Sequence, residues 1–172
     1  MTFIIIAAAV CAADQLLKYW VAANIAVGGY VPLLPGVIGL THARNTGAAF
    51  SLLSEHTWIL AAVSIVASLV ILYFILAKKL PFWEKFALAL VLGGAVGNAI
   101  DRAVLGYVVD MFSLEFVNFA IFNLADAFID VGAALFLVLY IIRTSREDKN
   151  RRMPELDRLR KNLTDEDIGH DD

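Results

Sequence analysis

Two aspartates in the apolar stretch from Gly93 to Asp126 can perform chemistry together. Asp110 sits in an outer connection, just after Gly106 to Val109, and Asp126 lies in the first turn or two of the last long apolar run. We expect both near one membrane surface at similar depth. Two carboxylates close together in a poorly solvated site share a proton and titrate as a pair. One can then deprotonate a water while the other protonates a carbonyl, which is the aspartic-protease pattern.

Other polar side chains accompany this pair within the same stretch. They are Asn98, Asp101, Arg102 and Asn123. Ionisable groups are costly in a bilayer and are rarely retained there without a role. Asn98, Asp101 and Arg102 follow at i, i+3 and i+4, so they share one helix face, and Arg102 can pair with Asp101 and still offer donors to a substrate or to a second carboxylate. The cluster is therefore the candidate functional site.

Competing chemistries have weaker support in the residues. Asp130, at i+4 from Asp126, is a possible second acid, but it lies about 6 Å further into the membrane at 1.5 Å per residue. We expect it to face the bundle or to be hydrogen-bonded. His42, His56 and His170 show no ligand spacing, so we expect solvated or turn histidines and no metal site. Catalysis by a serine or threonine nucleophile would need a paired histidine or lysine as base. Lys18 is already matched with Asp14, so no such nucleophile competes convincingly.

The elements that must position these residues are membrane helices. The chain has 172 residues, is 60% hydrophobic and has a mean hydropathy of +0.72. About 20 apolar residues cross a bilayer, and four runs are long enough: roughly Phe3 to Ala23, Trp58 to Ala77, Glu84 to Val104 and Ile121 to Ile142. The sequence therefore predicts an all-α membrane protein, a four-helix bundle with a small extracytoplasmic β-rich segment between its first two helices.

Charge distribution predicts the domains and the topology. Eight of the fourteen Lys and Arg lie beyond Ile142, mixed with nine acids, so we expect a membrane domain at 1–143 and a charged tail at 144–172. Lysines also flank the short connection between the second and third runs. The positive-inside rule then places this connection and both termini in the cytoplasm, with the 24–57 and 105–120 segments outside.

Further residues are candidates for supporting the site. Asp14 and Lys18 share a helix face at i, i+4 and can neutralise each other, although a purely structural ion pair is the alternative. Gly93 and Gly97 have the spacing that lets another helix approach closely. In the turn-rich first outer segment, Asn45 and Gly47 can receive an extended peptide or form an ordinary turn. Its Ala48–Phe50 side is expected to touch lipid.

Four motifs in order resemble a known family. The runs DQLLK, NTGAAFS, GGAVGNAIDRAVLGYVVDMF and FNLADAFI, spread over Phe3 to Ile142, are similar to bacterial lipoprotein signal peptidase, also called signal peptidase II. The resemblance implies that Asp110 and Asp126 are the catalytic dyad. It implies supporting roles for the matching polar and small residues, which are Asp14, Lys18, Asn45, Gly47, Asn98, Asp101, Arg102, Asn123 and Ala125.

The same resemblance implies an activity and a location. A member of this family removes signal peptides from prolipoproteins by cutting before a cysteine that carries a diacylglyceryl group, without metal or cofactor, and is inhibited by globomycin. The expected partners are lipid-modified prolipoproteins and membrane lipid, with no nucleic acid, and the expected state is a monomer in the bacterial plasma (inner) membrane with the active site near its outer face. The tail falls outside the resemblance.

Two other functions compete with a peptidase before the resemblance is considered. A small transporter would use Asp14, Asp101 and Asp126 as an ion path, but the acids cluster at one end of the bundle. A non-enzymatic assembly factor would use its charges to join helices. Ion flux and peptide cleavage, measured on the purified protein, distinguish these three functions.

Overall fold

The computed structural model describes residues 1–47 and 57–167. Ala48–Phe50, His56 and His170, on which expectations were stated above, lie outside the described residues. The chain divides into two compact units, Met1–Phe136 and Leu137–Asp172. The functional residues named above all belong to the first unit.

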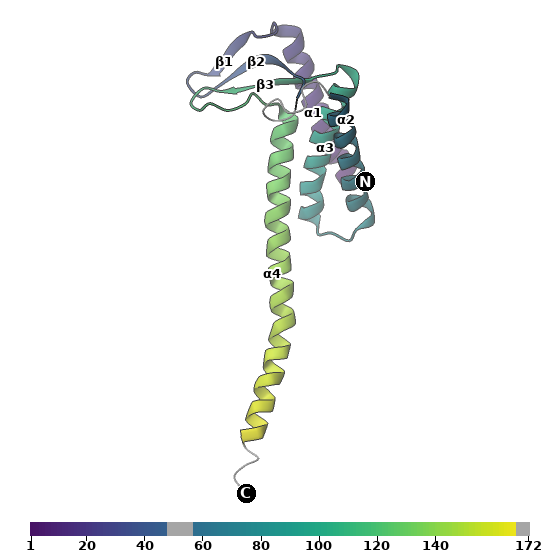
Figure 1. Ribbon diagram of the computed structural model, residues 1–172, viewed down its shortest axis with the longest axis vertical. Coiled ribbons are helices and arrows are strands. Elements are labelled where there is room, and N and C mark those ends of the chain that lie inside the picture. Colours follow the sequence, from purple (N-terminus) through teal and green to yellow (C-terminus); the bar gives the residue numbers. More distant parts are fainter. Residues whose placement is uncertain (48–56, 168–172) are drawn as a thin grey trace. The chain divides into compact units, whose positions relative to one another are not determined.

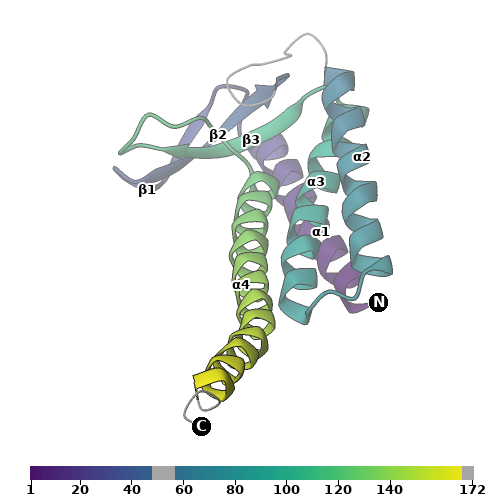
Figure 2. The ribbon, with the colours of Figure 1, turned by 60° about the horizontal axis from the view of Figure 1, so that its bottom comes forward.

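Four helices carry the apolar runs. They are α1 (Thr2–Asn24), α2 (Thr57–Ala77), α3 (Phe82–Val104) and α4 (Leu124–Asp167). Each contains a segment long and apolar enough to cross a membrane, as predicted from hydropathy. Helix α3 packs against both α1 and α2, so it is the central helix of this group (Figure 2).

Glycines on α3 allow this close packing. A Cβ added at Gly93 would lie 2.5 Å from the carbonyl oxygen of Ala7 on α1, and one at Gly94 would lie 2.5 Å from the carbonyl oxygen of Ala125 on α4. Real side chains do not come so close to backbone atoms, so only glycine fits at either position. The expectation that the glycines of this run serve helix packing is confirmed, and Gly94 adds a contact with the residue that precedes Asp126.

A three-stranded antiparallel sheet lies at the end of the bundle where α1 finishes and α4 begins (Figures 1 and 2). Its strands, in spatial order, are β1 (Tyr30–Leu34), β2 (Ile38–Asn45) and β3 (Val108–Leu114). The first two confirm the predicted β-rich segment. The N terminus and the α2–α3 connection lie at the opposite end of the helices.

Strand β3 was not predicted, and it holds Asp110. We expected this aspartate in an irregular connection, but it pairs with Ala43 of β2. The sequence hides the strand because Val108, Val109, Asp110 and Met111 are all buried. A strand buried on both faces lacks the alternation of apolar and polar residues that reveals a half-exposed one.

The expectation of a solvated or turn position is wrong for His42. Its side chain is 4% exposed on β2, and Nδ1 lies 2.9 Å from the carbonyl oxygen of Ile25. The neighbouring core contains Val21, Ile25, Leu40, Val109 and Met111, so the sheet packs on the end of α1 through apolar side chains. Burial of this core fixes the strand that carries Asp110 relative to the bundle.

The described part of the second unit, residues 137–167, belongs to helix α4, which extends past Pro154 to Asp167. Its described surface includes an exposed ion pair between Arg143 and Glu147, 3.3 Å apart. The division into a domain at 1–143 and a tail at 144–172 stays a prediction.

Candidate active site

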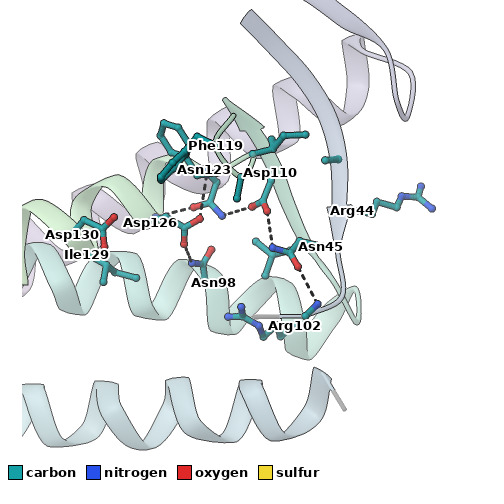
Figure 3. A pocket seen from close by; sticks show the side chains of 16 residues that line it. Arg44, Asn45, Asn98, Arg102, Asp110, Phe119, Asn123, Asp126, Ile129 and Asp130 are labelled. Atoms are coloured by element: carbon teal, nitrogen blue, oxygen red, sulfur yellow. Dashed lines mark hydrogen bonds between the residues drawn. The ribbon is translucent and has the colours of Figure 1, made fainter. Parts of the chain in front are cut away.

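A cavity of about 540 Å³ contains both predicted catalytic carboxylates (Figure 3). Strand β3 contributes Asp110 and the start of α4 contributes Asp126, while β2, α3 and the segment before α4 complete the walls. Asp110 is 2% exposed and Asp126 is half-buried. Residues from five separate parts of the chain thus converge on one site.

Asn123 connects the two carboxylates. Its side-chain Nδ2 donates to Oδ1 of Asp110 at 2.7 Å, and its Oδ1 accepts the backbone N–H of Asp126 at 2.9 Å. Its own backbone N–H donates to Oδ2 of Asp126 at 3.2 Å. This reciprocal pattern at the start of α4 has the form of a capping box. The amide therefore fixes the position of one carboxylate relative to the other.

Two more asparagines hold the outer sides of the pair. Asn45 donates to Oδ2 of Asp110 at 2.8 Å, and its oxygen accepts the backbone N–H of Gly47 at 3.0 Å. Asn98 donates to Oδ1 of Asp126 at 2.7 Å, and its oxygen accepts from Nζ of Lys18 at 2.8 Å. In each case a donor on the amide oxygen orients the NH2 group toward an aspartate.

Burial raises the pKa of Asp110 to about 6 from its ordinary value of 3.8. The hydrogen bonds from Asn45 and Asn123 oppose this rise, and the nearby charge of Asp126 adds to it. Asp110 can therefore hold a proton near neutral pH, as one member of an acid–base pair must.

A buried ion cluster lies behind the site. Lys18 Nζ lies 2.8 Å from Asp14 Oδ2 and 3.1 Å from Asp101 Oδ2, with all three side chains at most 3% exposed. The predicted pairing of Lys18 with Asp14 is confirmed, but Asp101 pairs with Lys18 and not with Arg102. Asp101 also accepts the backbone N–H of Val109 at 3.1 Å. The cluster thus connects α1 and α3 to strand β3, next to Asp110.

Gln15 is a supporting residue that the sequence did not reveal. Its Nε2 donates to Asp101 Oδ1 at 2.8 Å and to the backbone oxygen of Gly97 at 3.1 Å. It lies next to Asp14 in the run DQLLK. This position beside the Asp14–Lys18 pair was the one sequence feature that could have indicated its supporting role. An amide on a membrane helix is otherwise unremarkable in a sequence.

Arg102 and Asp130 line the cavity without being bound into this network. Arg102 Nη1 lies 3.5 Å from Ser64 Oγ, and its buried Nε has no hydrogen-bond partner among the described residues. Asp130 was expected to face the bundle or to be hydrogen-bonded; it lines the cavity, and its exposed carboxylate makes none of the hydrogen bonds or ion pairs found among the described residues. Both side chains thus line the cavity with a polar group, the Nε of Arg102 or the carboxylate of Asp130, that has no partner within the described part of the chain.

The cavity also has walls that sequence reasoning missed. Arg44 on β2 lies over the ring of Tyr107, 4.9 Å from its centroid. The segment before α4 adds Phe119 to Phe122, and the rings of Phe119 and Phe122 meet edge to face with centroids 5.9 Å apart. These loop residues show no periodicity, so only the folded chain reveals that they line the cavity.

Comparison with known proteins now gives the family. A family model described as "Signal peptidase (SPase) II" matches residues 6–142. The chain belongs to the signal peptidase II family. Lipoprotein signal peptidases of Streptococcus pyogenes serotype M6 and serotype M5 are 43% and 42% identical to it over 128 residues, covering 74% of this chain and 84% of each relative.

Solved structures agree with this membership of the signal peptidase II family. One, described as a bacterial membrane enzyme structure obtained by the in meso method, has a TM-score of 0.80 and 31% sequence identity, covering 84% of this chain and 90% of the other. A second of the same description has a TM-score of 0.74 and 31% identity. The chain is therefore a membrane-bound protease of the aspartic type, and the transporter and assembly-factor hypotheses are no longer needed.

Proposed function

We propose that Asp110 and Asp126 are the catalytic dyad of this signal peptidase. The observation that carries the proposal is the bridge through Asn123, which donates to Asp110 at 2.7 Å and accepts from the Asp126 backbone at 2.9 Å. The two carboxylates thereby share a wall of one cavity and a common hydrogen-bonded residue. Such an arrangement suits a pair that shares one proton.

The proposed reaction uses water as the nucleophile. Asp126, as carboxylate, takes a proton from the water, and the oxygen of this water attacks the scissile carbonyl carbon. Asp110, as carboxylic acid, donates its proton to the carbonyl oxygen, and the raised pKa of about 6 keeps this proton available. As the tetrahedral intermediate collapses, the C–N bond breaks, Asp126 protonates the leaving amine, and Asp110 takes back the hydroxyl proton.

The proposed substrate is a prolipoprotein whose cysteine carries a diacylglyceryl group. A helical signal peptide hides its carbonyls in its own hydrogen bonds, so the segment at the cut must be unwound at the membrane interface. Acyl chains partition into the bilayer with about 0.8 kcal/mol per buried methylene. They would fix the depth of the cysteine and hold the scissile bond beside the dyad. Part of the entropy lost in positioning the substrate is then lost on membrane binding, before the reaction.

The proposed topology has both termini in the cytoplasm of a bacterium and the cavity near the outer face of its plasma membrane. Lysines 78, 79 and 85 support it through the positive-inside rule. The sheet and the N terminus lie at opposite ends of the helices, in accord with this arrangement. Reporter fusions after Tyr30 and after Ile142 test it, and an inside signal at the first position would overturn it.

One cleavage experiment tests the proposed function. The purified protein in detergent is given the same precursor with and without the diacylglyceryl group, and cleavage is followed by gel shift. We expect the lipidated precursor to be cut before its modified cysteine and the unmodified one to remain intact. Comparable cleavage rates for the two forms would contradict the proposed substrate class.

A further inference from the structure

The polar side chains of the cavity fall into two groups. Asn45, Asn98 and Asn123 each use the amide oxygen and one amide N–H within the protein, and their N–H groups are directed at Asp110 or Asp126. Arg44, Arg102 and Asp130 also line the cavity but do not hold the dyad. The three asparagines position the carboxylates, so contacts with a substrate fall mainly to the second group.

Asp130 differs from the other members of the second group. Arg44 and Arg102 carry only hydrogen-bond donors, whereas an aspartate accepts. Outside the dyad and the asparagines that hold it, Asp130 is the only side-chain acceptor among the described residues that line the cavity. It is exposed, and its carboxylate makes none of the hydrogen bonds found within the described part of the chain.

An unwound peptide needs both hydrogen-bond donors and hydrogen-bond acceptors from the protein. Every residue of the segment presents a carbonyl and an N–H, and either group is costly to leave unpaired in an apolar surrounding. Arg102, with its buried and unpartnered Nε, can donate to carbonyls. Asp130 can accept from N–H groups. Apart from the dyad and its three asparagines, no other described side chain that lines the cavity can accept from a peptide N–H.

The position of Asp130 selects the part of the peptide that it reaches. It lies four positions after Asp126 on α4, which is about 6 Å of helix rise. An extended peptide covers this length with about two residues. Asp130 also lies further along the membrane-spanning part of α4 than Asp126 (Figure 3). Under the proposed function, an apolar signal peptide would extend from the cut in the same direction, into the membrane.

We propose that Asp130 is a specificity-determining residue, whose carboxylate accepts the backbone N–H of the signal peptide about two residues before the scissile bond. The inference rests on the proposed function, since it requires an unwound signal peptide in this cavity. An ionised intramembrane side chain usually faces a partner or a water-filled cavity. Here the partner is the substrate, and the carboxylate favours precursors that have a free N–H at this position.

The test removes the two ends of the proposed hydrogen bond separately and together. Lipidated precursors are made with an ester in place of the amide at each of the four positions before the cut, which deletes one N–H at a time. They are given to the wild-type protein, to Asp130→Leu and to Asp130→Asn, with Asp148→Asn in the second unit as a charge-matched control. The initial rates give kcat and KM for each combination.

We expect the ester two residues before the cut to lower wild-type kcat/KM about tenfold, because a hydrogen bond to a charged group is lost. Asp130→Leu should lower kcat/KM by a similar factor on the all-amide precursor, mainly through KM, and should then be insensitive to the ester. Asp130→Asn keeps an acceptor oxygen and should recover part of the loss. Asp148→Asn should behave as the wild type.

Equal sensitivity of Asp130→Leu and wild type to every ester would overturn the role of Asp130. So would an ester effect confined to positions next to the cut. If the wild-type protein fails to cut the all-amide lipidated precursor, the proposed function itself is wrong. The first two results leave that function intact, so the two failures are distinguishable.

Discussion

Asp14 on α1 accepts the backbone N–H of Ala125 through its Oδ1, at 2.9 Å. Ala125 is fully buried and directly precedes Asp126, so a carboxylate on the first helix fixes the first turn of the fourth. The other Asp14 oxygen lies 2.8 Å from Lys18 Nζ. The same ammonium donates to Asn98, which in turn donates to Asp126. One buried cation therefore helps to position Asp126 by two routes.

Lys18→Met should destabilise the protein strongly. The substitution leaves two carboxylates, Asp14 and Asp101, buried without their cation, and breaking a buried pair in this way costs about 3–5 kcal/mol. Thermal or denaturant unfolding in detergent measures the loss. Arg146→Met is the matched control, because its side chain is exposed and makes no ion pair within the described part of the chain, so its removal should change stability by at most about 0.5 kcal/mol. Equal losses in the two variants would show that the buried cluster contributes little.

Asp110→Asn and Asp126→Asn should each lower kcat by about 10² to 10⁴, since an amide keeps the size of the side chain but cannot transfer the proton. Asp130→Asn should retain far more activity than either. The comparison requires similar amounts of folded protein for all three, checked by expression level and melting temperature. Substantial activity in the Asp126 variant, or complete loss in a folded Asp130 variant, would mean that a different pair of acids is catalytic.

Gly94→Ala should reduce activity at least tenfold and lower the free energy of unfolding by about 1–3 kcal/mol. The added Cβ would lie 2.5 Å from the backbone oxygen of Ala125, so α3 and the start of α4 must separate and Asp126 must move. Initial cleavage rates and melting temperature report the two effects. Val104→Ala on the same helix, at a side chain that is 75% exposed, should change neither. Wild-type behaviour of Gly94→Ala would contradict the close approach.

Stability should depend on pH through Asp110. Its pKa is about 6 in the folded protein and 3.8 ordinarily, so between about pH 4 and pH 6 the folded state keeps a proton that the unfolded chain loses. The free energy of unfolding should therefore fall as pH rises through this window. Asp110→Asn cannot titrate, so the melting temperature of the wild type minus that of the variant should decrease from about pH 4 to about pH 6 and then level off. A difference that stays constant with pH would contradict the raised pKa.

Removal of the chain after Arg152 should leave cleavage and folding nearly unchanged. Residues 153–172 contain few apolar side chains and end in DEDIGHDD, so they cannot bury enough surface to support the membrane domain. Cleavage rate per amount of accumulated protein is the measurement. A truncation after Leu139, inside the last apolar run, should fail to accumulate. If the Arg152 truncation accumulates normally but loses cleavage, the tail takes part in function.

The sequence by itself determined the helices and the residues of interest. Apolar runs of about 20 residues are a local property that needs no partner to be recognised, and all four became helices. Polar groups within those runs stand out because the bilayer penalises them, which is why Asp14, Lys18, Asp101 and Asp126 could be named in advance. The pairing of Asp14 with Lys18 was also local, since i and i+4 share a helix face.

Tertiary structure alone decided how these residues are joined. Lys18 and Asn98, or Gln15 and Asp101, are more than 75 positions apart, and their contacts depend on which faces of α1 and α3 meet. The same holds for β3, whose register with β2 brings Asp110 opposite Ala43. The sequence allowed Arg102 to pair with Asp101, but Lys18 from another helix makes that ion pair. Helix packing and strand register join residues that are distant in sequence, and local periodicity carries no information about such pairs.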